Sequence, residues 1–299
     1  MAQYKNTVLK DGESGLIVPT LDPWDGSISE TSATSTFMTA WAEKATSLSL
    51  TATQTTTPDG GSGSMSCALD MLKIGLCALG NDTINHVWSK KSATIKTKNS
   101  ASRSIALETT MSSTSIEPYY KILAGKTGSM GNDNALLMVS EIDGVEVLGA
   151  ILGASQAGDR FPAMKQLLDI AKKILNNESV SGLSVTSATN AAVCIVPQTP
   201  SLWDDQTITP LYAQNETAQA GVASVAKVMT ALTALDYIND INANIEFTQR
   251  DINAGGSGQV FQVGDLVTVR DVLLSMFLPS SNQGATALAR YAGQIISSI

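Results

Sequence analysis

Apolar residues recur at helical spacing in the first third of the chain. One face of the stretch FMTAWAEKATSL would carry Phe37, Met38, Trp41, Ala45 and Leu48, which predicts an amphipathic helix. The Ser/Thr-rich segment TATQTTTPDGGSGS then ends that helix. A second helix is expected to start near Ser64 or Ser66, where a hydroxyl can cap free N–H groups. Its inward positions would be Leu69, Leu72, Ile74, Leu76 and Leu79.

The pattern changes to short alternating segments from about Ser92. SATIKTKN and SIALETT predict a strand pair. A hairpin is expected where ALLMVSEI and VEVLGAILGA flank Asp143-Gly144, a dipeptide that adopts the positive φ angles of a tight turn. GKTGSM should lie on an adjoining strand. PAMKQLLDIAKKIL, with Pro162 in its first turn, predicts a helix that packs on this sheet.

The second half of the chain follows a polar, Ser-rich segment, residues 176–190, which is typical of a linker. AAVCIVP and PLYAQN predict strands, and GVASVAKVMTALTALDYI predicts a buried helix. The chain ends in two helical stretches interrupted at Pro279. Residues 1–35, rich in Gly, Pro, Ser, Thr and Asp, are expected to be irregular apart from a short strand in GLIVPTL at 16–22.

Composition narrows the class of protein. The 299 residues are 43% apolar and 15% charged with a net charge of −8, which is typical of a globular protein and argues against a nucleic-acid partner. No stretch reaches the roughly 18 apolar residues that a membrane span needs. Cys67, Cys77 and Cys194 form no CxxC pair, and we expect them to be thiols packed as small hydrophobes. The single histidine, His86, is interpreted as structural, and no metal site is expected.

Ser224 and Lys227 are the first candidates for chemistry. Three residues apart at the start of an apolar helix, their side chains share a face, so the amine can reach the hydroxyl. A lysine in a desolvated site has a lowered pKa, and as a free amine it could take the serine proton. By itself the S-x-x-K spacing is a weak signal, because it recurs by chance.

Two further motifs strengthen the hypothesis. Ser280-Ser281-Asn282 lies at a break between helices, where side chains are free to point into a cleft. Lys126-Thr127-Gly128 begins a predicted strand, and Gly128 would leave room for a substrate to approach that edge. Each motif has a simpler interpretation as a solvated turn or an exposed strand lysine. Their joint presence in suitable contexts favours a shared site.

The sequence resembles the serine penicillin-recognising family, and most closely the low-molecular-mass D-alanyl-D-alanine carboxypeptidases. VASVAKVMTALTAL is similar to the S-x-x-K helix of that family, VGDLVTVRDVLLSMFLPSSNQGATALA to its S-x-N segment, and GKTGSM to its K-T-G strand. The likeness covers most of residues 36–299. It implies an α+β fold of the β-lactamase/transpeptidase type, with an antiparallel sheet flanked by helices and an all-helical region.

The order of the motifs departs from the family. Lys126-Thr127-Gly128 precedes Ser224 here, whereas the family has S-x-x-K first. Placing residues 176–299 before 1–175 restores the usual order, so we interpret 36–299 as a circularly permuted domain in which 176–190 joins the family's usual ends. A fragment of a tandem array is the alternative. In that case halves could pair within one chain or swap between chains, giving an oligomer.

The resemblance also implies roles for residues. Ser224 would be the nucleophile that forms an acyl-enzyme, Lys227 its general base, and Ser280 a proton relay to the leaving amine, tuned by Lys126. The expected substrate-binding residues are Asn282, Lys126, Thr127, Gly128 and Ser129, and the backbone N–H groups of Ser224 and Ser129 would form the oxyanion hole. No cofactor is implied. The family's fast β-lactamases use an E-x-x-L-N loop, which this sequence lacks before Lys126, so slow release of penicillin is expected.

The leading hypothesis is a serine-type D-alanyl-D-alanine carboxypeptidase that acts on peptidoglycan stem peptides and binds β-lactams. A β-lactamase, an esterase or a D-amino-acid amidase on the same scaffold stays open, as does a non-catalytic binding module whose site the permutation has misaligned. The substrate implies an extracytoplasmic location, secreted or in the cell envelope, although the polar start MAQYKNTVLKDGESG lacks the apolar segment of a secretory signal.

Overall fold

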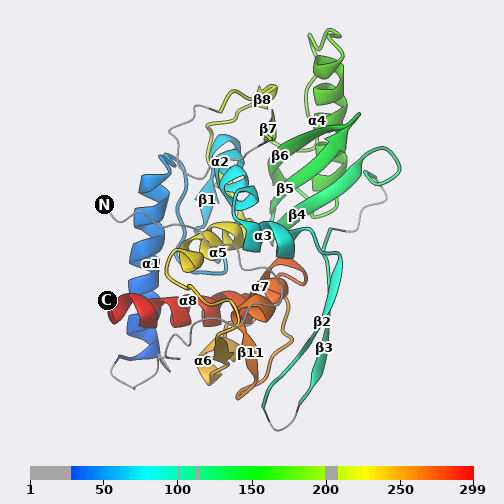
Figure 1. Ribbon diagram of the computed structural model, residues 1–299. Helices are drawn as coiled ribbons and strands as arrows, with labels where there is room; N and C mark the ends of the chain where they lie inside the picture. Colours follow the sequence, from blue (N-terminus) through cyan, green and yellow to red (C-terminus); the bar gives the residue numbers. More distant parts are fainter. Residues whose placement is uncertain (1–27, 100–101, 112–114, 199–207) are drawn as a thin grey trace.

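A five-stranded antiparallel sheet forms one side of the molecule in the computed structural model, which describes residues 28–99, 102–111, 115–198 and 208–299 (Figure 1). The strand order is β4-β5-β6-β7-β8, so β4 is an edge strand. The bounds are β4 (Lys121–Met130), β5 (Asp133–Ile142), β6 (Val145–Ala154), β7 (Asn190–Ile195) and β8 (Tyr212–Gln214). The predicted hairpin is confirmed, with Asp143 and Gly144 at φ 49° and 87°.

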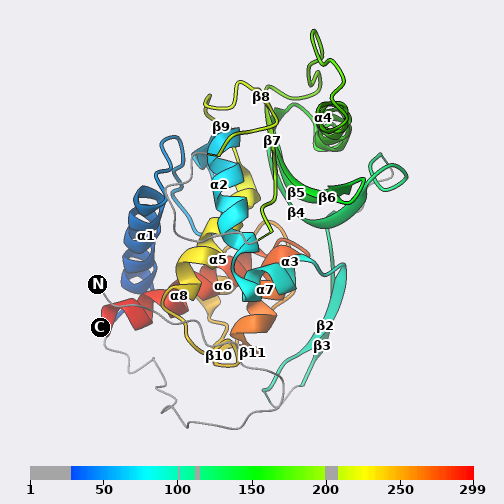
Figure 2. The same ribbon diagram turned by 45° about the horizontal axis from the view of Figure 1, so that its top comes forward.

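Both faces of this sheet are covered, which explains why the middle of β5, residues 135–139, is entirely apolar. Leu136 and Met138 belong to a cluster with α4 (Arg160–Leu175), whereas Leu137 and Val139 belong to the main core with α2 (Ala68–Leu79). Figure 2 shows α4 end-on over one face and α2 on the other. Alternate residues of a strand point to opposite faces, so a strand with two covered faces needs apolar side chains on both.

The remaining helices form an all-helical region on the α2 side of the sheet. They are α1 (Glu30–Ser47), α3 (Asp82–Trp88), α5 (Lys227–Leu235), α6 (Gln249–Ile252), α7 (Val269–Phe277) and α8 (Asn282–Ser297), with a 3-10 turn η1 (Ala223–Ala226) before α5. Three small antiparallel pairs complete it: β1 (Met65–Ser66) with β9 (Ala220–Gly221), β2 (Ser92–Lys96) with β3 (Ser104–Glu108), and β10 (Asn244–Glu246) with β11 (Leu266–Thr268). The mixed helix and antiparallel-sheet content is that of an α+β fold.

Two helix starts differ from the prediction. The first helix begins at Glu30 and not at Phe37, because the Ser29 hydroxyl accepts the Ser32 N–H and Glu30 favours the helix N-terminus. Residues 30–35 are therefore helical and not irregular. The second begins at Ala68 with the Cys67 thiol as its cap, because the hydroxyls of Ser64 and Ser66 are bonded to threonines instead.

Other expectations about the first third need smaller changes. Leu72, Ile74 and Leu79 of the second helix are buried as predicted, but Leu69 and Leu76 are only partly buried. The strand predicted at 16–22 lies outside the described residues. Cys67 and Cys194 are buried and Cys77 is partly buried, all as free thiols.

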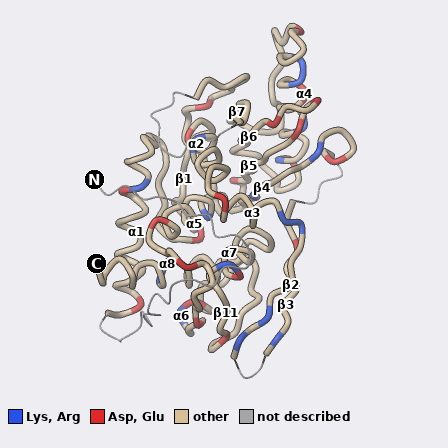
Figure 3. The backbone as a smooth tube through the Cα atoms, in the orientation of Figure 1, with Lys and Arg blue, Asp and Glu red and all other residues tan. Residues whose placement is uncertain are grey.

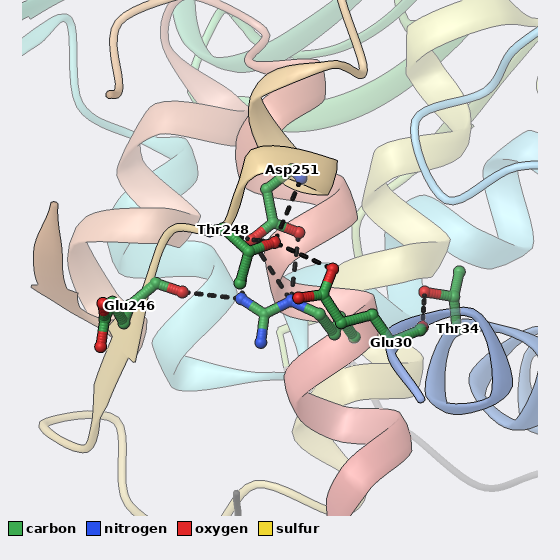
Figure 4. A network of polar contacts seen from close by, with 6 residues as sticks. Glu30, Thr34, Glu246, Thr248 and Asp251 are labelled. Atoms are coloured by element: carbon green, nitrogen blue, oxygen red, sulfur yellow. Dashed lines mark hydrogen bonds and ion pairs between the residues drawn. The ribbon is translucent and has the colours of Figure 1, made fainter. Parts of the chain in front are cut away.

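A buried ion pair joins α6 to α8 and brings in the start of α1 (Figure 4). The Arg290 guanidinium donates to the Asp251 carboxylate at 2.7 Å and to the Glu246 carbonyl oxygen, and Asp251 is fully buried. Thr248, which caps α6, donates to the Glu30 carboxylate at 3.0 Å. Three segments from the two ends of the sequence are therefore held by one polar network.

The start of α1 also packs directly on the end of α8. A side chain at Gly293 would collide with the Ala33 carbonyl oxygen, and the Ser297 hydroxyl lies 3.3 Å from that of Thr36. Glycine thus permits the close approach of the two helices. The last helix of the chain ends beside the first helix that the structure describes.

The predicted linker contains neither helix nor strand from residue 176 to 189. It connects α4 to β7 and is attached to the sheet side by Val185, which is buried and whose N–H donates to Gln214. Gly182, at φ 78°, has no atom near the position that a Cβ would take. This segment therefore crosses the surface with an open turn at its middle.

Candidate active site

Ser224 and Lys227 meet at the junction between η1 and α5. Ser224 lies in the 3-10 turn and Lys227 is the first residue of α5. The Lys227 Nζ lies 2.6 Å from the Ser224 Oγ. Lys227 is fully buried and Ser224 is partly exposed, so the hydroxyl is accessible while the amine beside it is not.

The Lys227 amine has two further partners. It lies 2.7 Å from the Asn282 Oδ1 and 3.0 Å from the Asp59 carbonyl oxygen. Burial lowers its pKa to about 7, because a charged ammonium is costly in a site without water. Near neutral pH a large fraction of this lysine is therefore an uncharged amine that can accept a proton.

A second serine–lysine pair lies next to the first. The Lys126 Nζ is 2.8 Å from the Ser280 Oγ and 2.8 Å from the Thr127 carbonyl oxygen. Lys126 is fully buried, and its pKa lies well below the usual range because of that burial and of the nearby charges of Lys227 and Arg160. Residues 154 positions apart in the sequence thus share one hydrogen bond.

The backbone is strained at Ser280 and directly before Ser224. Ala223, which precedes Ser224, has φ 46°, and Ser280 itself has φ 64°. The left-handed region costs residues other than glycine roughly 1–2 kcal/mol. Such strain persists only where the surrounding packing holds it, and Ser280 is held between α7 and α8 with its hydroxyl on Lys126.

Gly128 has a different role from the one expected. A Cβ at this position would lie 2.2 Å from the Val222 carbonyl oxygen. The space beside Gly128 is therefore filled by the turn that carries Ser224 and is not open to a substrate. Gly60 makes a matching approach, since its Cβ would lie 2.0 Å from the Ala223 oxygen. The two glycines allow β4 and the 58–61 loop to fix the backbone just before Ser224.

Thr127 and Ser129, on the same strand as Lys126, are joined to groups that the sequence reasoning missed. The Thr127 hydroxyl lies 2.7 Å from that of Thr110. Ser129 is exposed, and its hydroxyl oxygen accepts from the Arg160 guanidinium at 2.6 Å. Arg160 also donates to the Gly128 carbonyl oxygen at 2.9 Å.

Arg160 had a signal in the sequence. It is the first residue of α4, where a positive charge opposes the helix dipole. Residues that are unfavourable in their local secondary structure are often found at functional sites. Burial lowers its pKa, although it stays a cation. It therefore adds positive charge to the outer end of the Lys126 strand.

Asn282 occupies the position between the Ser224 turn and the 253–258 loop. Its Oδ1 accepts from Lys227, while its backbone N–H donates to the Ser257 carbonyl oxygen. A side chain at Gly256 would lie 2.3 Å from the Asn282 Nδ2. The amide group of Asn282 is thus held with its oxygen toward Lys227.

A groove of about 820 Å³ lies behind this site, between α1, the 56–61 loop and α6. Its wall includes the Asp59 residue whose carbonyl oxygen binds Lys227, but none of the predicted site residues lines it. His86 lies on the exposed side of α3. The described residues hold no cluster of His, Cys, Asp or Glu suited to a metal ion, and no helix among them is long and apolar enough to cross a bilayer.

All eight predicted site residues gather within this arrangement. Ser224, Lys227 and Asn282 are joined by hydrogen bonds, as are Lys126 and Ser280, and Thr127, Gly128 and Ser129 continue the Lys126 strand against the Ser224 turn. Chemically, the site offers two hydroxyls, each beside a lysine whose pKa is lowered. It is suited to attack on a carbonyl with transfer of the serine proton.

One comparison with known proteins finds a relation. Residues 186–295 match the family model described as D-alanyl-D-alanine carboxypeptidase. No curated protein and no solved structure matches the chain. The matched segment contains Ser224, Lys227, Ser280 and Asn282 but not Lys126.

Proposed function

We propose that the chain is a serine-type D-alanyl-D-alanine carboxypeptidase of the serine penicillin-recognising family, a proposal that the match of residues 186–295 to the D-alanyl-D-alanine carboxypeptidase model supports. Its substrates would be peptidoglycan stem peptides, and β-lactams would acylate it. The observation that carries the proposal is the 2.6 Å contact between the Lys227 amine and the Ser224 hydroxyl, beside the second pair of Lys126 and Ser280.

Acylation begins at Ser224. The uncharged Lys227 amine takes the hydroxyl proton as the Ser224 Oγ attacks the carbonyl carbon of the terminal peptide bond. The negative charge that develops on the carbonyl oxygen is stabilised by the backbone N–H groups of Ser224 and Ser129, each worth roughly 3–4 kcal/mol. The contact of Lys227 with Asn282 and Asp59 supports this role, because these acceptors fix the amine against the hydroxyl.

Departure of D-alanine needs a proton on its nitrogen. The Ser280 hydroxyl relays to this nitrogen the proton that Lys227 took from Ser224, and Lys126, whose Nζ is 2.8 Å from the Ser280 Oγ, tunes that hydroxyl. The C–N bond breaks, Ser224 keeps the acyl group as an ester, and free D-alanine leaves. Water then attacks the ester, Lys227 takes the proton of that water, and the proton passes to the Ser224 oxygen as the acyl group leaves as a carboxylic acid. Without an added glutamate to activate that water, the release of a penicilloyl group is slow.

The terminal carboxylate of the substrate would bind at Ser129 and Thr127. Since Ser129 accepts from Arg160, its own hydroxyl hydrogen is free to donate to a carboxylate. Arg160 adds positive charge beside them. A free carboxylate at the end of the substrate distinguishes a carboxypeptidase from an endopeptidase. The acyl side of the peptide would lie along β4, an edge strand, with its amide near Asn282.

The order of elements supports a circular permutation of this family's domain. The segments 28–175 and 208–299 pack into one fold in which α8 ends beside the start of α1. The linker 176–189 joins α4 to β7 across the sheet side. We place the protein outside the cytoplasmic membrane, where peptidoglycan lies.

Intact-mass measurement after exposure to benzylpenicillin tests the reaction. A single adduct of the drug's mass is expected on the wild type and none on Ser224→Ala, with Ser62→Ala as a matched control that should label normally, since Ser62 lies exposed on the loop beyond Gly61. Release of D-alanine from diacetyl-lysyl-D-Ala-D-Ala should exceed nitrocefin turnover. The absence of an adduct at saturating drug would refute the catalytic proposal, and nitrocefin turnover without D-alanine release would favour a β-lactamase.

A further inference from the structure

The β2–β3 hairpin concentrates positive charge in an acidic protein. Between Asp82 and Glu108 the sequence has five basic residues and no acidic one, although the whole chain carries −8. Lys90 and Lys91 lie directly before β2, at the base of the ribbon, and Lys96, Lys98 and Arg103 lie within the hairpin. Figure 3 shows blue positions along this ribbon, whereas blue and red positions mix on α4. The charge of the ribbon is therefore opposite to that of the molecule as a whole.

Most of these cations face solvent. Lys90, Lys91, Lys96 and Lys98 are exposed. Arg103 is neutralised by an ion pair with the buried Asp265. Lys91 has only a distant contact with Glu117, at 3.5 Å, and within the described part of the chain neither Lys90 nor Lys96 has an ion-pair partner. Three ammonium groups thus remain largely uncompensated.

The cations lie along a line. Lys98 lies seven positions after Lys91, a distance of roughly 23 Å in an extended chain at about 3.3 Å per residue. The inward side chains of the ribbon, Ile95, Ile105 and Leu107, are buried against the helical region. The large apolar side chains that the described residues expose are not part of the ribbon: they are Tyr119, Met130, Leu183, Ile195, Ile299 and Val263, of which Val263 precedes Gly264, a contact of Asn99 near the ribbon tip. The ribbon therefore exposes positive charges that can bind an anionic ligand, but no large apolar side chain that could insert into a lipid layer.

We propose that the β2–β3 ribbon binds a linear polyanion, a polymer that bears phosphate or carboxylate groups at regular intervals. A line of cations matches a line of anions, whereas peripheral binding to a membrane usually combines charge with apolar insertion. Charge complementarity raises both the affinity and the rate of encounter. The proposal does not depend on the reaction assigned above.

The base of the ribbon is attached to the active site. β3 continues to Thr110, whose hydroxyl meets that of Thr127, and whose backbone N–H donates to the Leu278 carbonyl oxygen just before Ser280. A polymer held on the ribbon would therefore lie beside the site. If the proposed function is correct, the ribbon would favour substrate near anionic wall polymers.

Binding is tested with fluorescently labelled long-chain inorganic polyphosphate and with poly-L-glutamate, over a series of salt concentrations. The test variant is Lys90→Gln/Lys91→Gln/Lys96→Gln. The control is Lys121→Gln/Lys172→Gln/Lys173→Gln, which removes the same charge from exposed or partly exposed lysines that each face a carboxylate. Each ribbon lysine should contribute about fivefold to affinity at low salt, so the test variant should bind roughly a hundredfold more weakly.

The control variant should bind within about threefold of the wild type, and wild-type binding should weaken steeply with salt. Equal losses in both variants would mean that net charge alone attracts the polymer, and would overturn the proposal. So would binding to vesicles of phosphatidylglycerol and phosphatidylcholine without binding to either polymer. Thermal melting and the penicillin adduct, both expected to match the wild type, show that the test variant is folded with an intact site.

Discussion

Two lysines in this protein are buried against serine hydroxyls and not against carboxylates. A carboxylate would hold a lysine charged, whereas a hydroxyl and a carbonyl oxygen do not offset the cost of burying that charge. Lys227 therefore has a pKa of about 7, and that of Lys126 is lowered as well. The same burial that destabilises the ammonium form makes each amine a usable base.

The rate of acylation by benzylpenicillin should rise with pH through about 7 and level off above it. The neutral amine is the active form, and it is lost as pH falls below the pKa of Lys227, so the rate should drop about tenfold per pH unit on the acid side. Stopped-flow or intact-mass kinetics between pH 5 and 9, in a range where the fold is stable by circular dichroism, measure this. A rate independent of pH across that range would exclude Lys227 as the base.

Gly128→Ala should damage the site through the backbone and not through the substrate. Its methyl group would collide with the Val222 carbonyl oxygen and push β4 away from the Ser224 turn. Overpacking of this kind costs about 1–3 kcal/mol, and a displacement of about 1 Å can lower the rate about a hundredfold. Thermal melting and penicillin acylation measure both effects. Gly158→Ala, at an exposed turn where no atom lies within 4 Å of the added methyl group, is the matched control and should acylate normally.

The sequence identified which residues meet at the site better than it identified how they are held. Ser224, Lys227, Ser280 and Lys126 follow from spacing, local context and resemblance. The contacts of Asp59, Gly60, Thr110 and Arg160 are made across long separations by residue types that are common in loops. Only Arg160 breaks a local rule that a sequence can reveal, because it puts a positive charge at a helix N-terminus.

At the scale of elements, the short helix α6 makes polar contacts with both α1 and α8. α6 has four residues, too few to be stable alone. Its Asp251 receives the Arg290 guanidinium, and its capping Thr248 reaches Glu30. Each of α1 and α8 is therefore oriented by a polar group on α6 as well as by apolar contact.

Arg290→Met should destabilise the protein by about 3–5 kcal/mol, because it leaves the Asp251 carboxylate buried without its partner. Urea denaturation followed by circular dichroism measures the change in the free energy of unfolding. The double variant Asp251→Leu/Arg290→Met removes both charges and should recover part of that loss. If the double variant is as unstable as the sum of the single variants, the cost arises from packing and not from the unpaired charge.

Strong local signals fixed most elements correctly. The Asp143-Gly144 hairpin and the helix after Pro162 depend on turn chemistry and period, which act over a few residues. The predicted start of the first helix was wrong because residues 30–35 include Ser and Thr, which are weak helix formers. Their helical state depends on the Ser29 cap and on contact between Ala33 and Gly293, at the far end of the chain.

At the scale of the whole molecule, the two parts of the chain on either side of residues 176–189 contribute complementary parts of the site. Lys126 and its strand come from one part, and Ser224 and Ser280 come from the other. The helical region also mixes α1, α2 and α3 from the first part with α5 to α8 from the second. Neither part has a complete core by itself.

A reordered chain should fold to the same structure. Joining Ile299 to Met1 and opening the chain at Gly182, where the backbone is exposed and uncrowded, restores the motif order of the family. We expect a melting temperature within a few degrees of the original and the same rate of penicillin acylation. A reordered chain that aggregates, or that folds without acylation, would argue against the permutation.

The hydrogen bond between Lys126 and Ser280 spans 154 positions of the sequence. The site can therefore form only after both segments have been synthesised. During synthesis the Lys126 strand leaves the ribosome long before the helix that follows Ser280. A nascent chain carries one half of the machinery while the other half is still untranslated. If the proposed function is correct, products that end before Ser280 would not react with penicillin, and drug labelling would report only molecules in which Ser280 and α8 had been synthesised.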